Sequence, residues 1–204
     1  MFADLLVKNG QSSYVTSTLL PIIKYDLEWV LGNWQSDGCD LWEEVRSNDF
    51  FWNRAGYVYT LNWCETIFNK LGDSSFASRC SSVKSSVKAT LDAHWTGSFV
   101  RESTNREKDT AVIHAFSSFD VYSLTDSKVA KTIQVLTQTF CSEYAINQQE
   151  IKSGIPGILM GRYPGDSYAG GNPWQLLTAV LAEVFYQGAS VLLESNGFLT
   201  EEHK

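Results

Sequence analysis

Apolar residues recur at three- and four-residue spacing along most of the chain, which predicts α-helices. In the segment 20–34 they form one stripe, and Pro21 lies near its start, where a missing N–H costs least. The members of this stripe are Leu20, Ile23, Leu27, Val30, Leu31 and Trp34. The preceding segment 2–10 is typical of the end of a helix, closed by Asn9-Gly10.

The same spacing predicts further helices in the middle of the chain. We expect one over 50–71, with Gly72 as its stop. Another is expected to open at Ser74 or Ser75, and a third to be capped by Asp126.

The final helix has the clearest boundary signals. Asn172 is a favourable N-cap residue, Pro173 suits the first helical position, and Gly197 provides a stop. Strand-like alternation is scarce, and no internal repeat or linker is visible. We therefore predict an all-α chain of about six or seven helices. Because the chain opens on the end of a helix, we expect 1–204 to be part of one larger domain.

Composition adds a high share of aromatic residues and an acidic charge. Aromatic side chains make up 13% of the 204 residues, and the formal net charge is -7. Aromatic rings dominate core packing, but they also form flat apolar platforms on which sugar rings stack. Nucleic-acid binding needs clustered cations, and this chain has no basic cluster, so we expect no nucleic-acid partner.

The cysteines leave the disulfide pattern open. Four cysteines allow three pairings, and buried free thiols fit the sequence equally well; they are Cys39, Cys64, Cys80 and Cys141. The chain has no CxxC pair and only three scattered His, so we expect no zinc site and no other cofactor. We also expect no secretory signal at the start and no apolar run of membrane-spanning length, hence no membrane partner. The oligomeric state is not indicated.

Three carboxylates surround a tryptophan in the segment 38–45. Asp40, Glu43 and Glu44 lie within five residues of one another, on both sides of Trp42. Like charges held close together favour the protonated form of one of them, which is the form that a general acid needs. Trp42 would offer an apolar wall for a sugar. A solvated acidic turn with a chance tryptophan is the alternative.

A second segment, 161–174, combines rigid turn residues with charges and aromatic rings. Arg162 and Asp166 can donate to and accept from sugar hydroxyls in fixed directions, and rings such as that of Trp174 can stack on a pyranose face. The alternative is an ordinary capped loop that contains an Arg–Asp pair.

Together these two segments resemble the glucoamylase family, glycoside hydrolase family 15. Residues 40–45, followed by Phe50-Phe51, are similar to that family's segment DLWEEV and its FF pair. Residues 161–174 are similar to its segment GRYPxDxYxxGNPW. Weaker similarities lie between them, at 95–99 (WTGSF) and 113–116 (IHAF). The resemblance implies an (α/α)6 toroid of inner and outer helices, incomplete in this chain because family domains are considerably longer.

The resemblance also implies an activity and a set of site residues. Family members are glucan 1,4-α-glucosidases, which release glucose from the non-reducing ends of starch- or glycogen-type α-1,4-glucans by an inverting acid/base mechanism without a cofactor. They are commonly secreted. The implied catalytic residues are Glu43, as proton donor, and Asp40. The implied substrate-binding residues are Trp42, Glu44, Arg162, Asp166 and Trp174.

Several departures bear on activity. Asp37 stands where the family usually has Ser, Thr or Asn, and Gly165 replaces a residue that is often acidic. No segment matches the family's catalytic base, and the context of Glu201 and Glu202 differs from that motif. We therefore expect this chain alone to be weakly active or inactive. The main alternative is a non-catalytic carbohydrate-binding or regulatory glucoamylase-like module. A third option, an (α/α)6 hydrolase for another glucoside, is opposed by the Arg162 segment.

The short separation between Asp40 and Glu43 argues against Asp40 as the water-activating base. Side chains three residues apart on a helical turn lie about 5–6 Å from each other at Cβ. An inverting pair is separated by about 6.5–9.5 Å, which leaves room for the water. We therefore expect Asp40 to tune Glu43 or to contact substrate.

Overall fold

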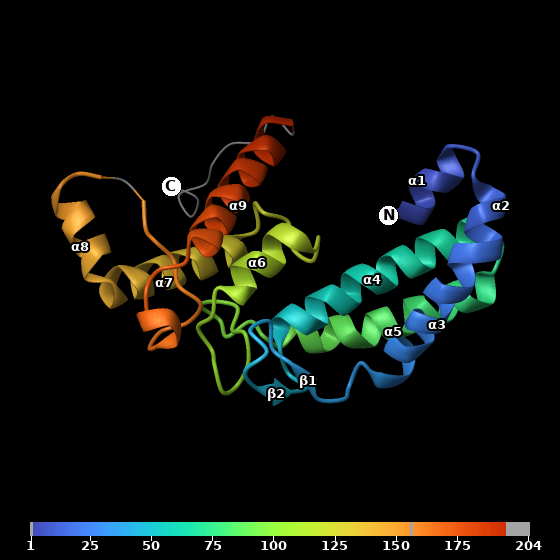
Figure 1. The fold of residues 1–204 in the computed structure, drawn as a ribbon, viewed down its shortest axis with the longest axis horizontal. Helices are drawn as coiled ribbons and strands as arrows, with labels where there is room; N and C mark the ends of the chain where they lie inside the picture. Colours follow the sequence, from blue (N-terminus) through green and yellow to red (C-terminus); the bar gives the residue numbers. More distant parts are fainter. Residues whose placement is uncertain (1, 156, 195–204) are drawn as a thin grey trace. The chain divides into compact units, whose positions relative to one another are not determined.

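Helices dominate the computed structural model, which describes residues 2–155 and 157–194 (Figure 1). About 64% of the chain is helical, so the all-α prediction is confirmed. The elements are α1 (Phe2–Lys8), α2 (Ser12–Tyr14), a π-helix (Val15–Leu19), α3 (Leu20–Asn33), β1 (Gly38–Cys39), β2 (Arg46–Ser47), α4 (Phe51–Lys70), α5 (Ser74–Asp92), α6 (Ala111–Ser118), α7 (Ser127–Glu143), α8 (Ala145–Lys152), a 3-10 helix (Tyr168–Gly170) and α9 (Gln175–Glu194).

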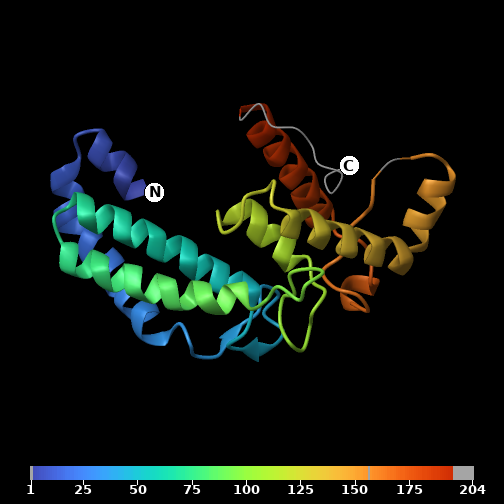
Figure 2. The same ribbon diagram turned by 180° about the vertical axis from the view of Figure 1, so that it is seen from behind.

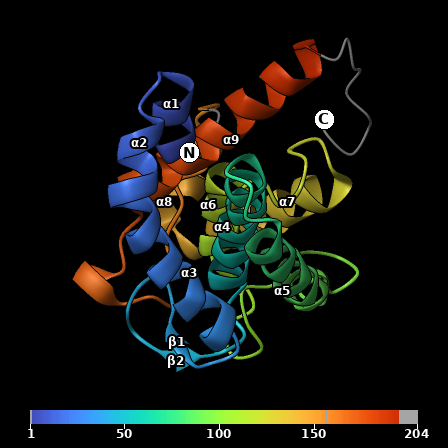
Figure 3. The same ribbon diagram turned by 90° about the vertical axis from the view of Figure 1, so that its right-hand side faces the viewer.

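The chain divides into two compact units. The first comprises residues 1–48 and 53–91, and the second comprises residues 49–52 and 92–204. In the first unit, α4 and α5 lie side by side (Figures 2 and 3). A disulfide joins Cys64 of α4 to Cys80 of α5, and the buried ring of Phe68 lies 4.4 Å from that of Phe76. The structure thus resolves the pairing that the sequence left open.

Helix α3 belongs to the same unit and has one buried residue and two ion pairs to other parts of it. Leu27 is the only member of the predicted apolar stripe that is fully buried. Glu28 pairs with Arg79 of α5, and Lys24 pairs with Asp73 just before it. The other apolar side chains of the helix are less covered. Three that are exposed by more than half are Ile22, Tyr25 and Trp29.

The second unit is built from α6, α7, α8 and α9. Helix α6 contacts α7 and α9, and α7 contacts α8. Phe51 anchors the core of this unit: its ring meets Phe116 edge-on at 5.8 Å and stacks on Tyr122 at 6.2 Å. Helix α6 was not predicted, because eight residues are too few for the three- and four-residue spacing to register.

Most of the predicted helix boundaries are confirmed. Helix α4 ends just before Gly72, whose φ of 82° suits a glycine stop. Helix α5 begins at Ser74. The carboxylate of Asp126 accepts the N–H of Lys128 at 2.8 Å and caps α7.

The predicted start of the last helix is wrong. Helix α9 begins at Gln175, so Asn172 is not its N-cap and Pro173 is not its first residue. The N–H of Trp174 donates to the carbonyl of Met160 at 2.8 Å, which ties the preceding residues to a loop. The side chain of Asn172 donates to the carbonyl of Ala169. Gly197, the predicted stop, lies outside the described residues.

Helix α9 is the one described helix that is long and apolar enough to cross a membrane, by length and composition alone. The expectation of no such run is therefore wrong. One face of the helix packs on the protein through Leu177, Val180, Leu181 and Val184. Because core helices of soluble proteins meet the same criteria, the finding is weak support for a membrane partner.

Candidate active site

The acidic segment 40–45 forms the loop of a β-hairpin. Strands β1 and β2 are antiparallel, with Gly38 opposite Ser47 and Cys39 opposite Arg46. The guanidinium of Arg46 donates to the carbonyl of Asp37 at 2.9 Å and braces the hairpin stem. The sequence did not predict this hairpin, because two-residue strands are too short to show alternation.

Glu43 lies near the end of this loop in an unusual backbone conformation. Its N–H donates to the carbonyl of Asp40 at 3.1 Å, which closes a four-residue turn. Its φ is 59°, in the left-handed region that glycine and asparagine normally occupy in hairpin loops. The residue is exposed, so its carboxylate is accessible to a ligand.

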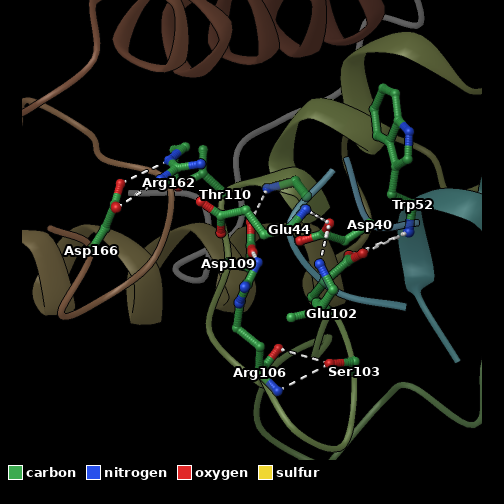
Figure 4. A network of polar contacts seen from close by, with 12 residues as sticks. Asp40, Glu44, Trp52, Glu102, Ser103, Arg106, Asp109, Thr110, Arg162 and Asp166 are labelled. Atoms are coloured by element: carbon green, nitrogen blue, oxygen red, sulfur yellow. Dashed lines mark hydrogen bonds and ion pairs between the residues drawn. The ribbon is translucent and has the colours of Figure 1, made fainter. Parts of the chain in front are cut away.

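The other predicted residues of the segment share the loop. Asp40 is only 5% exposed, and its Oδ1 accepts the N–H of Glu44 at 2.8 Å and that of Val45 at 3.2 Å (Figure 4). Trp42 is half-buried, whereas the side chain of Glu44 is exposed. The loop therefore presents an accessible acid beside a tryptophan, with one buried carboxylate beneath.

Arg162 and Asp166 form a buried bidentate ion pair in the second segment (Figure 4). Nε of Arg162 donates to Oδ2 at 2.8 Å and Nη2 donates to Oδ1 at 2.7 Å. The two side chains are only 4% and 3% exposed. The hydrogen bonds from Arg162, and a further one from the N–H of Tyr168, lower the pKa of Asp166 below its ordinary value, against the opposing effect of burial.

Three aromatic rings surround the Arg162 guanidinium. Its central carbon lies 5.2 Å from the ring centre of Tyr163, 4.9 Å from that of Tyr168 and 5.2 Å from that of Trp174. Cation–π attraction and the ion pair fix the direction of the guanidinium. Tyr168 is 61% exposed, so its ring is available for stacking. Sequence reasoning did not single out Tyr168, although it occupies a defined position of the quoted motif.

Close packing explains the glycine that precedes Arg162. A Cβ on Gly161 would clash with the Tyr144 hydroxyl, so no side chain fits there. Thr110 donates its hydroxyl to the carbonyl of Gly161 at 2.6 Å and its N–H to the carbonyl of Arg162 at 2.8 Å. These contacts fix the backbone on both sides of the peptide that carries Arg162.

Glu102 is a buried carboxylate that the sequence analysis missed. It is 1% exposed, and its two carboxylate oxygens lie 3.2–3.3 Å from the N–H of Trp52, which they accept at the start of α4. Its carbonyl accepts the N–H of Phe51 at 2.8 Å. Fifty residues separate the partners, so no local signal could have revealed this cap.

The structure brings the predicted residues together within each segment. Asp40, Trp42, Glu43 and Glu44 share the hairpin loop of the first unit, and the other three share one loop of the second unit; these are Arg162, Asp166 and Trp174. Within residues 2–155 and 157–194, no three or more His, Cys, Asp or Glu side chains are grouped so as to hold a metal ion.

The helical fold defines the class of protein: it corresponds to part of an (α/α)6 toroid of the glycoside hydrolase type. The sequence profile of glycosyl hydrolases family 15 matches residues 1–200, and the chain belongs to that family.

Its relatives are glucoamylases. The chain is 30% identical to glucoamylase P of Amorphotheca resinae over 206 residues, which cover 93% of this chain and 32% of the relative. It is 30% identical to glucoamylase 1 of Rhizopus oryzae over 223 residues, with coverages of 97% and 35%. The chain thus spans about a third of the length of these relatives.

Solved structures agree. The structure of Hormoconis resinae glucoamylase superimposes with a TM-score of 0.82 at 28% identity, over 99% of this chain and 36% of that one. The glucoamylase of Saccharomycopsis fibuligera gives a TM-score of 0.74 at 27% identity, over 85% of this chain and 40% of that one. The fold is therefore that of part of an (α/α)6 toroid, as the resemblance implied.

Proposed function

We propose that this chain is the part of a glucan 1,4-α-glucosidase that supplies the catalytic acid and the arginine-lined sugar site. One observation carries the proposal: Glu43 is exposed at the end of a hairpin loop in a left-handed conformation. Non-glycine residues in such conformations cluster at active sites. The match to the family over residues 1–200 supports the view that both units belong to one catalytic domain.

The proposed reaction is a single displacement at the anomeric carbon. Glu43 donates its proton to the glycosidic oxygen while the bond from that oxygen to the anomeric carbon breaks. A second carboxylate removes a proton from water, which attacks the opposite face of the sugar. The products are β-glucose, whose anomeric configuration is inverted, and a glucan shortened by one unit. Asp40 is a poor candidate for the base, because it is buried and its Oδ1 accepts two backbone N–H groups.

The second loop suits an uncharged sugar. Arg162 supplies directed donors, and its charge is balanced by Asp166 within hydrogen-bonding distance. The exposed ring of Tyr168 and the half-buried ring of Trp174 offer apolar faces to a pyranose. An anionic ligand would gain little from a cation that is already neutralised.

Sugar binding can be tested on the chain itself. We expect maltotriose to shift the indole resonances of Trp42 and Trp174, and cellotriose, its β-1,4 counterpart, to leave them unchanged. Equal responses to both trisaccharides would contradict α-glucan specificity.

Catalysis is tested best in a chimera in which this chain replaces the matching segment of Hormoconis resinae glucoamylase. The Glu43→Gln variant keeps the shape of the side chain but cannot donate a proton, so kcat on maltose should fall by about 10²–10⁴-fold. Nuclear magnetic resonance of the fresh product should show β-glucose. Near-normal turnover in the glutamine variant would assign the acid to another residue.

The second candidate function is a non-catalytic carbohydrate-binding or regulatory module. It is favoured by the burial of Asp40, whose Oδ1 already accepts two backbone N–H groups and is therefore poorly placed to activate water. This second function predicts the same selective binding of maltotriose. It differs in predicting that the chimera binds sugar but releases no glucose.

A further inference from the structure

The hairpin loop is closed by one residue, Asp40. Its N–H donates to the carbonyl of Val45 at 3.0 Å, and its own carbonyl accepts the N–H of Glu43 at 3.1 Å. Its Oδ1 accepts the N–H groups of Glu44 and Val45 at 2.8 and 3.2 Å. Four hydrogen bonds within six residues therefore meet at Asp40, which is buried while Glu43, Glu44 and Val45 are exposed.

The left-handed conformation of Glu43 and the side-chain bonds of Asp40 depend on each other. Successive backbone N–H groups in a turn that contains a left-handed residue can point towards one place and make a small anion-binding concavity. Here those two groups belong to Glu44 and Val45, and the carboxylate of Asp40 fills the concavity. Without an acceptor there, the turn loses the bonds that compensate a conformation unfavourable for glutamate.

We propose that Asp40 is a positioning residue: its carboxylate oxygen holds Glu43 in the left-handed conformation and so sets the direction of the acid side chain. The inference rests on the proposed function, in which Glu43 is the acid. It replaces a catalytic role for Asp40 with a specific geometric one. What the role requires of residue 40 is an acceptor oxygen at the position of Oδ1, not a group that takes up a proton.

This requirement separates two variants. Asp40→Asn keeps a carbonyl oxygen that can accept both N–H groups, whereas Asp40→Ala removes the acceptor. A general base fails in both variants, because neither amide nor methyl takes up a proton at neutral pH. If Asp40 is a positioning residue, its function is lost in Asp40→Ala and kept in Asp40→Asn. Asp37→Asn, which neutralises an exposed carboxylate three residues away, is the matched control.

The first test uses the full 204-residue chain and needs no activity. A strong intraresidue nuclear Overhauser effect between the amide proton and Hα of Glu43 reports positive φ. We expect it in the unsubstituted chain, in Asp40→Asn and in Asp37→Asn. In Asp40→Ala it should disappear, and the amide resonances of Glu44 and Val45 should move. Circular dichroism should remain unchanged in all four. Persistence of the signal in Asp40→Ala would overturn the proposal.

The second test uses kcat in the chimera described above. We expect Asp40→Ala to lose about 10²-fold, the scale of a misplaced catalytic group, with KM for maltose little changed. Asp40→Asn should stay within about tenfold of the parent. Equal losses of about 10²–10⁴-fold in both variants would make Asp40 a proton-transfer residue. If Glu43→Gln is fully active, the acid assignment fails instead, while the resonance test of the Asp40–Glu43 geometry stands.

Discussion

At the scale of single residues, the candidate site contains a glutamate, Glu43, in a backbone conformation that this residue type disfavours. Hairpin loops favour glycine or asparagine at a left-handed position, and this one has Glu43. The motif indicated Glu43 as the acid, but nothing in the sequence indicated its backbone conformation. That conformation depends on the hydrogen bonds to Asp40, which can be seen only once the loop is closed.

We predict that the site stores strain that glycine would release. A non-glycine residue in the left-handed region costs about 1–2 kcal/mol, part of which glycine gives back through greater freedom in the unfolded chain. Glu43→Gly should therefore be more stable than Glu43→Ala by about 1 kcal/mol, because both lack the carboxylate and only alanine keeps the Cβ. Urea unfolding of the two variants measures the difference. A less stable glycine variant would show that the left-handed conformation is unstrained.

The Arg162–Asp166 pair should make stability depend on pH in the acid range. The pKa of Asp166 is lowered in the folded protein, so its contribution is present above the ordinary aspartate pKa of about 3.9 and is lost as pH falls through the lowered value. Breaking a buried pair costs about 3–5 kcal/mol. Asp166→Asn should lose that amount of unfolding free energy at pH 7. The difference in unfolding free energy between this variant and the unsubstituted chain should become smaller below pH 4. A difference that does not change with pH would contradict the assignment.

At the scale of elements, the sequence predicted the long helices and the short α1, but it missed the short helices α6 and α8. Helices α3, α4, α5 and α7 each contain several turns, so their apolar spacing was visible before any packing was known. Helices α6 and α8, of eight residues each, and the two-residue strands lack that length. They form because tertiary contacts fix them, as when Thr110, just before α6, bonds to the Gly161 and Arg162 carbonyls.

The disulfide between α4 and α5 should contribute substantially to the stability of the first unit. It closes a loop between residues 16 apart, for which the chain-entropy estimate is about 3 kcal/mol. Reduction, or Cys64→Ser with Cys80→Ser, should lower the free energy of unfolding by about that amount. Replacing the two free cysteines, Cys39 and Cys141, is the control and should leave it nearly unchanged. Equal stabilities of the reduced and oxidised chains would show that the bond adds nothing.

At the scale of the whole molecule, apolar surface is left uncovered on two helices. Helix α9 is strongly apolar on average, yet its buried residues lie on one face, and 22% of its apolar 18-residue stretch is buried. Helix α3 likewise exposes Ile22, Tyr25 and Trp29. Such faces are typical of helices that further elements cover. The sequence revealed the apolar character of both helices, but not which of their faces pack against the rest of the described residues, because that depends on tertiary contacts.

We therefore expect the isolated chain to be helical but prone to association, with little or no release of glucose from maltose or starch. Sedimentation velocity should show oligomers that a double substitution of exposed residues in α9, Tyr186→Lys with Leu193→Lys, reduces without loss of helicity. Substituting the buried Leu181 by lysine is the contrasting control and should unfold the helix. A purified monomer with robust turnover would overturn both the expected association and the expected inactivity.

The backbone at Glu43 also constrains how this gene can change. Both glutamate codons become glycine codons through a single transition. The substitution that would remove the proposed proton donor and relieve the expected strain of the turn is therefore among the most accessible mutations at that site. Selection for abundance alone would favour it, and only selection for turnover would oppose it. A library of this chain screened for solubility should accumulate glycine at position 43, whereas a library screened for glucose release should exclude it.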